Sequence, residues 1–151
     1  DYILTDCASC ESTLKTYSNS DFINLGELIA QQNLKFKFQK PIKVTFHKPC
    51  HLENDDFWQK ILTNCENVEY VKMQDYDECC GFSGEFTIKN PKIATQLMKQ
   101  KAKNAAATGA DYVVTTCPAC VIGLKLGLRG IKKLPKVVSL SDFLSLASIK
   151  Y

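Results

Sequence analysis

Apolar and polar residues follow one another in patterns that predict strands alternating with helices. Residues 42–46 alternate apolar and polar side chains, as a short strand does. Helical spacing of apolar residues follows over 55–65, and residues 68–73 predict a second strand. A long helix is predicted to begin at Pro91 and stop at Gly109. The remaining predicted elements are a strand over 112–115, a helix over 118–128, a strand over 136–139 and a helix from Ser141 through Ile149.

This order of elements predicts an α/β fold with a small parallel sheet and helices on both of its faces. Parallel strands that alternate with helices are joined by right-handed crossovers. The strand at 112–115 lacks alternation, so we expect it to be buried on both sides. Ligands of such sheets bind beyond the carboxyl ends of the strands. The loops that follow the strands are therefore the expected location of a site.

One segment of the chain is repeated. Residues 1–10 match residues 111–120, with Asp, Tyr, Thr and both cysteines of a C-x-x-C motif identical at an offset of 110. A looser match relates residues 22–29 to 137–144. A repeat of this length indicates two copies of one domain. We therefore expect residues 1–38 to be the tail of a preceding copy and residues 39–151 to form a complete copy.

Composition narrows the classes of function. The chain has 151 residues, a net charge of +3 and 45% apolar residues, which is typical of a globular chain with its own core. This charge gives no reason to expect a nucleic-acid partner, and no apolar stretch approaches the length of a membrane span. Eight cysteines is a high number for this chain, because a protein of this length can form a stable core without disulfide bonds. Because we find no signal peptide, we expect a reducing, cytoplasmic location in which the cysteines serve chemistry.

Five cysteines follow three separate strands and are expected to meet at one edge of the sheet; they are Cys50, Cys79, Cys80, Cys117 and Cys120. Thiolates are soft ligands that select zinc, copper(I) and iron–sulfur clusters. Cys117 and Cys120 begin a predicted helix, whose N-terminus favours the thiolate form. A tetrahedral zinc ion needs four ligands, so five cysteines are one too many for a simple structural site. An iron–sulfur centre would use the surplus.

Three motifs make the chain resemble a known family, the cysteine-rich CCG domain. They are His47-Lys-Pro-Cys50-His51, Cys79-Cys-Gly-Phe-Ser-Gly84 and Thr116-Cys-Pro-Ala-Cys120. This Rossmann-like α/β domain, usually present in two copies, occurs in iron–sulfur subunits of glycolate and lactate oxidases, anaerobic glycerol-phosphate dehydrogenase, some succinate dehydrogenases and heterodisulfide reductase. The resemblance implies that the five cysteines ligate a [4Fe-4S]-type cluster, which is non-cubane in heterodisulfide reductase. In some relatives one copy holds zinc instead.

The resemblance also implies an electron-transfer role and a set of partners. Electrons would pass between a flavoprotein subunit and quinone or a disulfide acceptor. Other iron–sulfur or membrane-anchor subunits are expected partners, so the chain would reach the inner membrane only peripherally, through them. The glycolate or lactate oxidase and succinate dehydrogenase types are favoured. Because the preceding copy is incomplete here, we expect this fragment of an oxidoreductase subunit to bind metal without turning over substrate alone.

Two other functions stay open on the residues alone. The cysteines could be structural ligands of a zinc-stabilised domain that binds a partner protein. Alternatively, Cys117 and Cys120 could form the dithiol of a disulfide oxidoreductase, because a C-x-x-C motif between a strand and a helix is typical of such enzymes.

Five further residues are weaker candidates. His47 and His51 flank Cys50, and hydrogen bonding in support of the site is favoured over direct metal ligation for both. Cys7 and Cys10 are either a leftover half-site or a pair that is oxidised or metal-bound in isolation. Cys65 lies outside any motif and is interpreted as a packing or surface residue.

Overall fold

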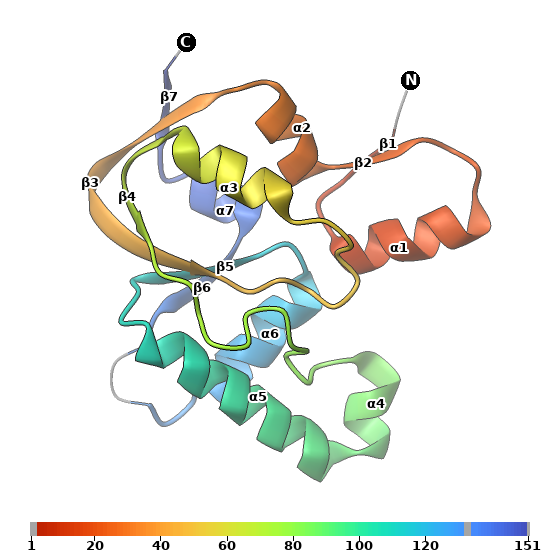
Figure 1. The fold of residues 1–151 in the computed structure, drawn as a ribbon. Helices are drawn as coiled ribbons and strands as arrows, with labels where there is room; N and C mark the ends of the chain where they lie inside the picture. The colour runs from red at the N-terminus through yellow and green to blue at the C-terminus, as the bar shows by residue number, and fades with distance from the viewer. Residues whose placement is uncertain (1–2, 132–133, 151) are drawn as a thin grey trace.

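A parallel sheet lies between two layers of helices (Figure 1). The computed structural model describes residues 3–131 and 134–150, so Asp1 and Tyr2 of the repeated segment lie outside the described residues. Neighbouring strands of the main sheet run parallel in the order β4-β3-β5-β6, and β7 pairs antiparallel with the start of β3. The bounds are β3 (Lys35–Phe46), β4 (Cys65–Tyr70), β5 (Tyr112–Thr115), β6 (Lys136–Ser139) and β7 (Ser148–Lys150). The predicted α/β class is confirmed.

Helices cover both faces of this sheet (Figure 1). One layer holds α3 and α7, and the other holds α5 and α6, while the short α4 stands apart beside the end of α5. The bounds are α3 (Asp56–Thr63), α4 (Gly84–Lys89), α5 (Pro91–Ala107), α6 (Pro118–Gly127) and α7 (Leu140–Leu144). Pro91 and Pro118 each open their helix, where the missing N–H of proline costs no hydrogen bond.

The core is divided by the sheet into two clusters. Trp58 stacks on Phe46 with ring centroids 4.8 Å apart, and Phe143 completes this first cluster. Val113 and Val114 are both fully buried and face opposite clusters, because successive side chains of a strand point to opposite faces. This is the burial that the unbroken apolar run at 112–115 predicts.

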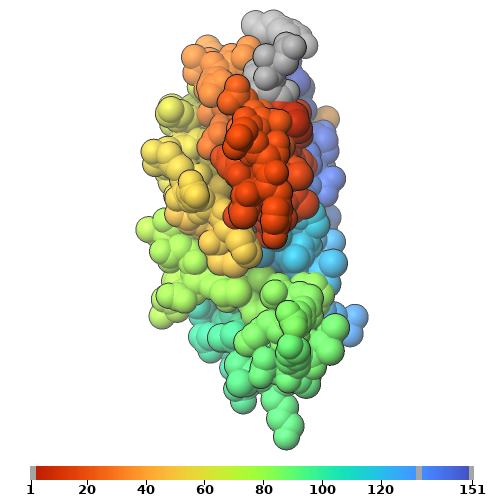
Figure 2. All heavy atoms as spheres, turned by 90° about the vertical axis from the view of Figure 1, so that its right-hand side faces the viewer, coloured from red at the N-terminus to blue at the C-terminus, as the bar shows by residue number. Residues whose placement is uncertain are grey.

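The N-terminal segment forms a small unit of its own beside the main sheet. Its elements are β1 (Ile3–Thr5), α1 (Ala8–Tyr17), β2 (Phe22–Asn24) and α2 (Leu25–Gln31), and β1 pairs in parallel with β2. The order strand, helix, strand, helix repeats that of β5, α6, β6 and α7. Figure 2 shows α1 (red) and α4 (green) on the same side of the molecule.

Several boundaries differ from the predictions, among them that of the strand expected over 68–73, which is β4 over Cys65–Tyr70. The helix expected to reach Cys65 ends at Thr63, because the next residues pair with the start of β3, where Phe36 lies opposite Cys65. The last helix ends at Leu144 and not at Ile149, since Ile149 pairs with the same Phe36 in β7. Accordingly, β3 begins at residue 35 and is longer than the strand predicted over 42–46.

Candidate metal centre

Five cysteine side chains line a single cavity of about 560 Å³. Each group follows a parallel strand at its carboxyl end: Cys50 follows β3, the Cys79–Cys80 pair lies in the segment after β4, and Cys117 and Cys120 follow β5. The three innermost of the five are buried; they are Cys80, Cys117 and Cys120. Cys50 and Cys79 are exposed, so they lie at the mouth of the cavity. The structure therefore brings together residues that are up to 71 positions apart in the sequence.

The adjacent pair Cys79–Cys80 depends on the glycine that follows it. Gly81 has a φ of +82°, a region that side-chain-bearing residues rarely adopt. A β-carbon on Gly81 would also lie 2.5 Å from Leu97 Cβ and 2.9 Å from the Ala94 carbonyl oxygen. The backbone can therefore pass close against α5 only because this residue has no side chain, and that approach carries both sulfurs into the cavity.

Two buried polar side chains of α5 hold the loop that leads to this pair. Lys101 Nζ donates to the Asp75 carbonyl oxygen, and Asn104 Nδ2 donates to the Gln74 carbonyl oxygen at 3.1 Å. Burial lowers the pKa of Lys101, whose side chain is 3% exposed. These hydrogen bonds fix the loop to the helix without involving the sulfur atoms, which therefore remain available as metal ligands.

Hydrogen bonds link the buried sulfurs to one another. Cys80 Sγ and Cys120 Sγ lie 3.4 Å apart. A hydrogen bond with Cys120 lowers the pKa of Cys117 to about 5 against the effect of burial, and hydrogen bonds with Cys120 and Cys79 lower the pKa of Cys80. The pKa of Cys120 is raised in turn by its hydrogen bonds with Cys117 and Cys80 and by burial. The lowered pKa values of Cys80 and Cys117 favour thiolates, which are the soft, anionic ligands that suit a thiophilic metal centre.

His47 reaches the same sulfurs from the end of β3. Its side chain is fully buried, and Nδ1 lies 3.2 Å from the Tyr76 carbonyl oxygen. Because a carbonyl only accepts, Nδ1 carries the proton and Nε2 presents a lone pair. Nε2 has no hydrogen-bond partner among the described residues, and a ring nitrogen of His47 lies within 4.8 Å of Cys80 Sγ and Cys120 Sγ. A buried nitrogen without a partner, on a ring beside two sulfurs, also fits a metal-binding site.

The weaker cysteine candidates lie apart from this cavity. Cys7 caps the start of α1, where its sulfur accepts a hydrogen bond from the Cys10 N–H at 3.3 Å, and neither residue lines the cavity. Burial raises the pKa of Cys7 to about 11. Cys65 is the first residue of β4, and burial raises its pKa to about 11 as well. The motif-free cysteine is therefore a protonated packing residue of the strand.

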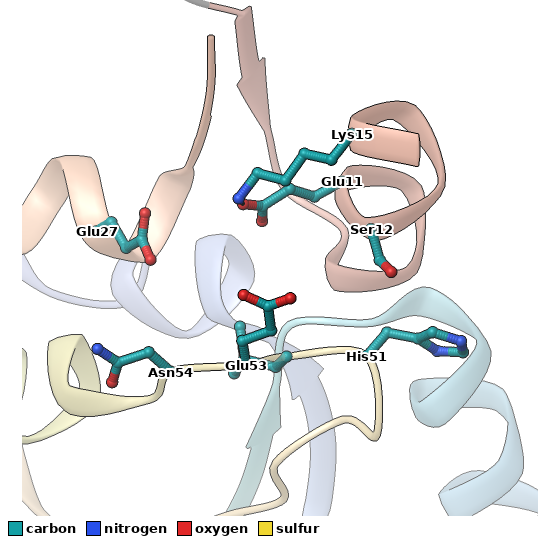
Figure 3. A pocket seen from close by; sticks show the side chains of 8 residues that line it. Glu11, Ser12, Lys15, Glu27, His51, Glu53 and Asn54 are labelled. Carbon is teal, nitrogen blue, oxygen red and sulfur yellow. Dashed lines mark hydrogen bonds and ion pairs between the residues drawn. The ribbon is translucent and has the colours of Figure 1, made fainter. Parts of the chain in front are cut away.

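A second, smaller cavity of about 70 Å³ separates α1 from the loop after Cys50 (Figure 3). Carboxylates of Glu11, Glu27 and Glu53 surround it. Lys15 Nζ lies 2.6 Å from Glu11 Oε1, and Asn24 Nδ2 donates to the other oxygen at 3.1 Å. Both carboxylate oxygens of the buried Glu11 have partners within the N-terminal unit, so this cavity is explained as a polar junction between that unit and the main domain.

Sequence reasoning missed two kinds of residue at the large cavity. Phe82, Phe86 and Leu97 provide apolar walls, and the last two come from α4 and α5. Ser9 enters from α1, although the first C-x-x-C motif itself stays outside. The sequence signal that could have identified Ser9 is the repeat, in which Ser9 corresponds to Ala119 of the second copy.

Comparison with known proteins gives consistent matches. The model of the CCG cysteine-rich domain family matches residues 44–125. An uncharacterized iron-sulfur protein of Methanococcus maripaludis is 32% identical over 158 positions, covering 94% of this chain and 32% of that protein. One subunit of the CoM/CoB fumarate reductase of Methanothermobacter marburgensis is 32% identical over 157 positions, with 94% and 32% covered. Lactate utilization protein A of Oceanobacillus iheyensis is 32% identical over 107 positions, with 68% and 44% covered.

The chain spans between a third and a half of the length of these relatives. Within residues 3–131 and 134–150, no helix combines the length and the apolar character that a membrane crossing requires.

Proposed function

The chain belongs to the CCG cysteine-rich domain family, and on that premise we propose that it is an electron-transfer domain that binds an iron–sulfur cluster. The proposed ligands are Cys50, Cys79, Cys80, Cys117 and Cys120. The observation that carries the proposal is that these five sulfurs, and no other cysteine of the chain, line one cavity at the carboxyl ends of the strands. Iron–sulfur clusters are held by cysteine thiolates, and relatives named as iron-sulfur proteins support the same chemistry.

The size of the cavity favours a cluster over a single ion. A water molecule takes up about 30 Å³ in the liquid, whereas this cavity measures about 560 Å³. Five thiol ligands also exceed the four that a tetrahedral zinc ion takes. A [4Fe-4S]-type cluster, of which a non-cubane form is one version, would use both the space and the extra sulfur.

The residues of the chain would set the properties of such a centre. When bound, the cluster supplies a site that gains and loses single electrons. Burial of Cys80, Cys117 and Cys120 among apolar side chains keeps water from the inner sulfurs. The unpartnered nitrogen of His47 would act in the site as a sixth ligand, because ligating sulfurs have no proton to donate to its lone pair. Ligand identity, burial and hydrogen bonding to sulfur are the variables by which a protein tunes the reduction potential.

We also propose how the domain fits into a larger assembly. Residues 39–151 would form one complete copy of the family domain, and residues 1–38 would be the tail of a preceding copy. Relatives named as subunits of a fumarate reductase and of a heterodisulfide reductase are parts of multi-subunit oxidoreductases. By analogy, this domain would accept electrons from a flavoprotein subunit and pass them to quinone or a disulfide, in complexes of the lactate oxidase or succinate dehydrogenase type.

One specific observation favours a second candidate, a structural zinc site. The ligand atoms of His47, Cys80 and Cys120 already lie within 4.8 Å of one another, and one more cysteine would complete a tetrahedron. A dithiol oxidoreductase is less well supported. Cys117 and Cys120 are only 3% and 4% exposed, so a protein disulfide could not reach either sulfur.

Metal analysis distinguishes these functions. The chain would be purified without oxygen, and its iron, acid-labile sulfide and zinc would be measured beside a visible absorption spectrum. We expect about four iron ions and four sulfide ions per chain, with broad absorption at about 400 nm. One zinc and no colour would overturn the cluster in favour of the structural site.

Single Cys→Ser variants then test the ligand set. Each of the five proposed positions should lose most of the iron, whereas Cys65→Ser, the matched control in β4, should retain all of it. A single silent position among the five would instead indicate four ligands, as zinc requires.

A further inference from the structure

Two of the proposed ligand sulfurs are joined by a chain of polar contacts across the mouth of the cavity. Cys50 Sγ lies 3.5 Å from His51 Nδ1, and Ser9 Oγ lies 3.4 Å from the same nitrogen. Ser9 Oγ also lies 3.4 Å from Cys117 Sγ. Ser9 belongs to α1, outside residues 44–125 that the family model matches. A residue of the N-terminal unit is therefore in contact with a sulfur of the main domain.

The backbone around Ser9 is held firmly against the main domain. The Ala8 N–H donates to the Thr116 carbonyl oxygen at 2.9 Å, directly before the Cys117 ligand. Ala8 is 1% exposed, and Ser141 Oγ donates to Asp6 Oδ2 at 2.6 Å. The turn that starts α1 is thus docked through two contacts immediately before Ser9. The contact of Ser9 with sulfur follows from this docking and is not a chance rotamer of a surface side chain.

The chemistry of the two ends determines the direction of the hydrogen bonds. A ligating Cys117 carries no proton, so the Ser9 hydroxyl must donate to its sulfur. A hydroxyl has one proton, so in its contact with His51 Ser9 Oγ can only accept, and His51 Nδ1–H donates. The hydroxyl therefore stabilises negative charge on that sulfur.

We propose that the Ser9 hydroxyl, held by His51, donates a hydrogen bond to the Cys117 ligand sulfur and thereby raises the reduction potential of the cluster. This inference rests on the proposed function. Reduction adds negative charge to the cluster and its sulfurs, and a donor at a ligand sulfur stabilises the reduced form more than the oxidised form. Through Ser9, the N-terminal unit acts as a positioning element for a centre whose ligands all come from the main domain.

The test is a redox titration of the loaded chain. Ser9→Ala removes the hydroxyl without changing the helix, and Ser9→Thr keeps it. Ser12→Ala is the matched control, because Ser12 lies on the same helix and lines the smaller cavity instead. At a fixed potential, we expect Ser9→Ala to lower the ratio of reduced to oxidised cluster about three- to tenfold, where tenfold corresponds to about 59 mV for one electron. Ser9→Thr and Ser12→Ala should match the wild type.

Iron and sulfide content are measured in the same samples, and they separate the possible outcomes. An unchanged potential in Ser9→Ala, with a wild-type cluster content, overturns the inference alone. A Ser9→Ala chain that folds but holds no iron also overturns it, because Ser9 would then be required for assembly and not for tuning. A wild-type chain without iron and sulfide overturns the proposed function together with this inference.

Discussion

Replacing Gly81 by alanine tests whether the backbone after the cysteine pair is as constrained as the structure indicates. The new methyl group would meet Leu97 Cβ at 2.5 Å and the Ala94 carbonyl oxygen at 2.9 Å. Neither atom is the free end of a flexible side chain, because one is a β-carbon and the other is helix backbone. The loop must therefore move away from α5, and the two sulfurs before it must move as well.

Two terms add up in the expected loss of stability. A positive φ costs a residue with a side chain about 1–2 kcal/mol, and overpacking against a rigid neighbour typically costs about 1–3 kcal/mol. Gly81→Ala should therefore lose about 2–5 kcal/mol of the free energy of unfolding. Domains of this kind have only about 5–15 kcal/mol in total, so the variant should be visibly unstable.

Urea denaturation of the reduced chain under anaerobic conditions measures this loss, and two other glycines serve as controls. Gly109 has a φ of +65° but open space around it, so Gly109→Ala should show only the backbone term. Gly84 also has open space and no positive φ, so Gly84→Ala should be neutral or slightly stabilising. We further expect Gly81→Ala to bind less iron than Gly109→Ala. Equal stability losses in Gly81→Ala and Gly109→Ala would refute the close approach to α5.

Two more predictions concern residues near the site. The folded state raises the pKa of Cys65 from 9.0 to about 11, so it holds more protons than the unfolded state between these values. The contribution of Cys65 to the free energy of unfolding should therefore be fully present below pH 9, and about 1–2 kcal/mol of it should be lost as the pH rises to 11. Urea titrations at both pH values should show that Cys65→Ala lacks this part of the loss. His47→Ala should weaken iron binding about 10- to 100-fold, while the exposed His51→Ala keeps its iron, as metal analysis after dialysis against a chelator would show. Equal retention in both variants would contradict a role for the buried nitrogen.

Local sequence patterns correctly predicted those helices and strands whose formation depends mainly on their own residues. The bounds of β5 and β6 agree with the strands predicted at 112–115 and 136–139, and α5 starts at the proline that predicts it. Unbroken apolar runs and helix-start signals are read from a few neighbouring positions, so they need no knowledge of the rest of the fold. The same applies to the five cysteines, which could be placed at strand ends because each group follows a predicted strand.

Predictions failed where a segment pairs with a strand that is distant from it in the sequence. The residues around Cys65 and Ile149 have helical spacing, but both pair with Phe36 from opposite sides of β3. Hydrogen bonding to a buried strand outweighs a weak helix propensity, and this energy is invisible in a local window. The short α4 was missed for a related reason, since it has no buried residues of its own to produce a pattern.

The sequence by itself determined the parallel α/β class, the family and the five thiols that gather at one sheet edge. Only the tertiary structure decided the relation of these thiols to the rest of the chain. It placed the orphaned His47 nitrogen beside two sulfurs and brought the Ser9 hydroxyl from α1 to Cys117. Strand order and motif spacing are properties of the chain, whereas hydrogen bonds between segments about a hundred residues apart exist only after the core has packed.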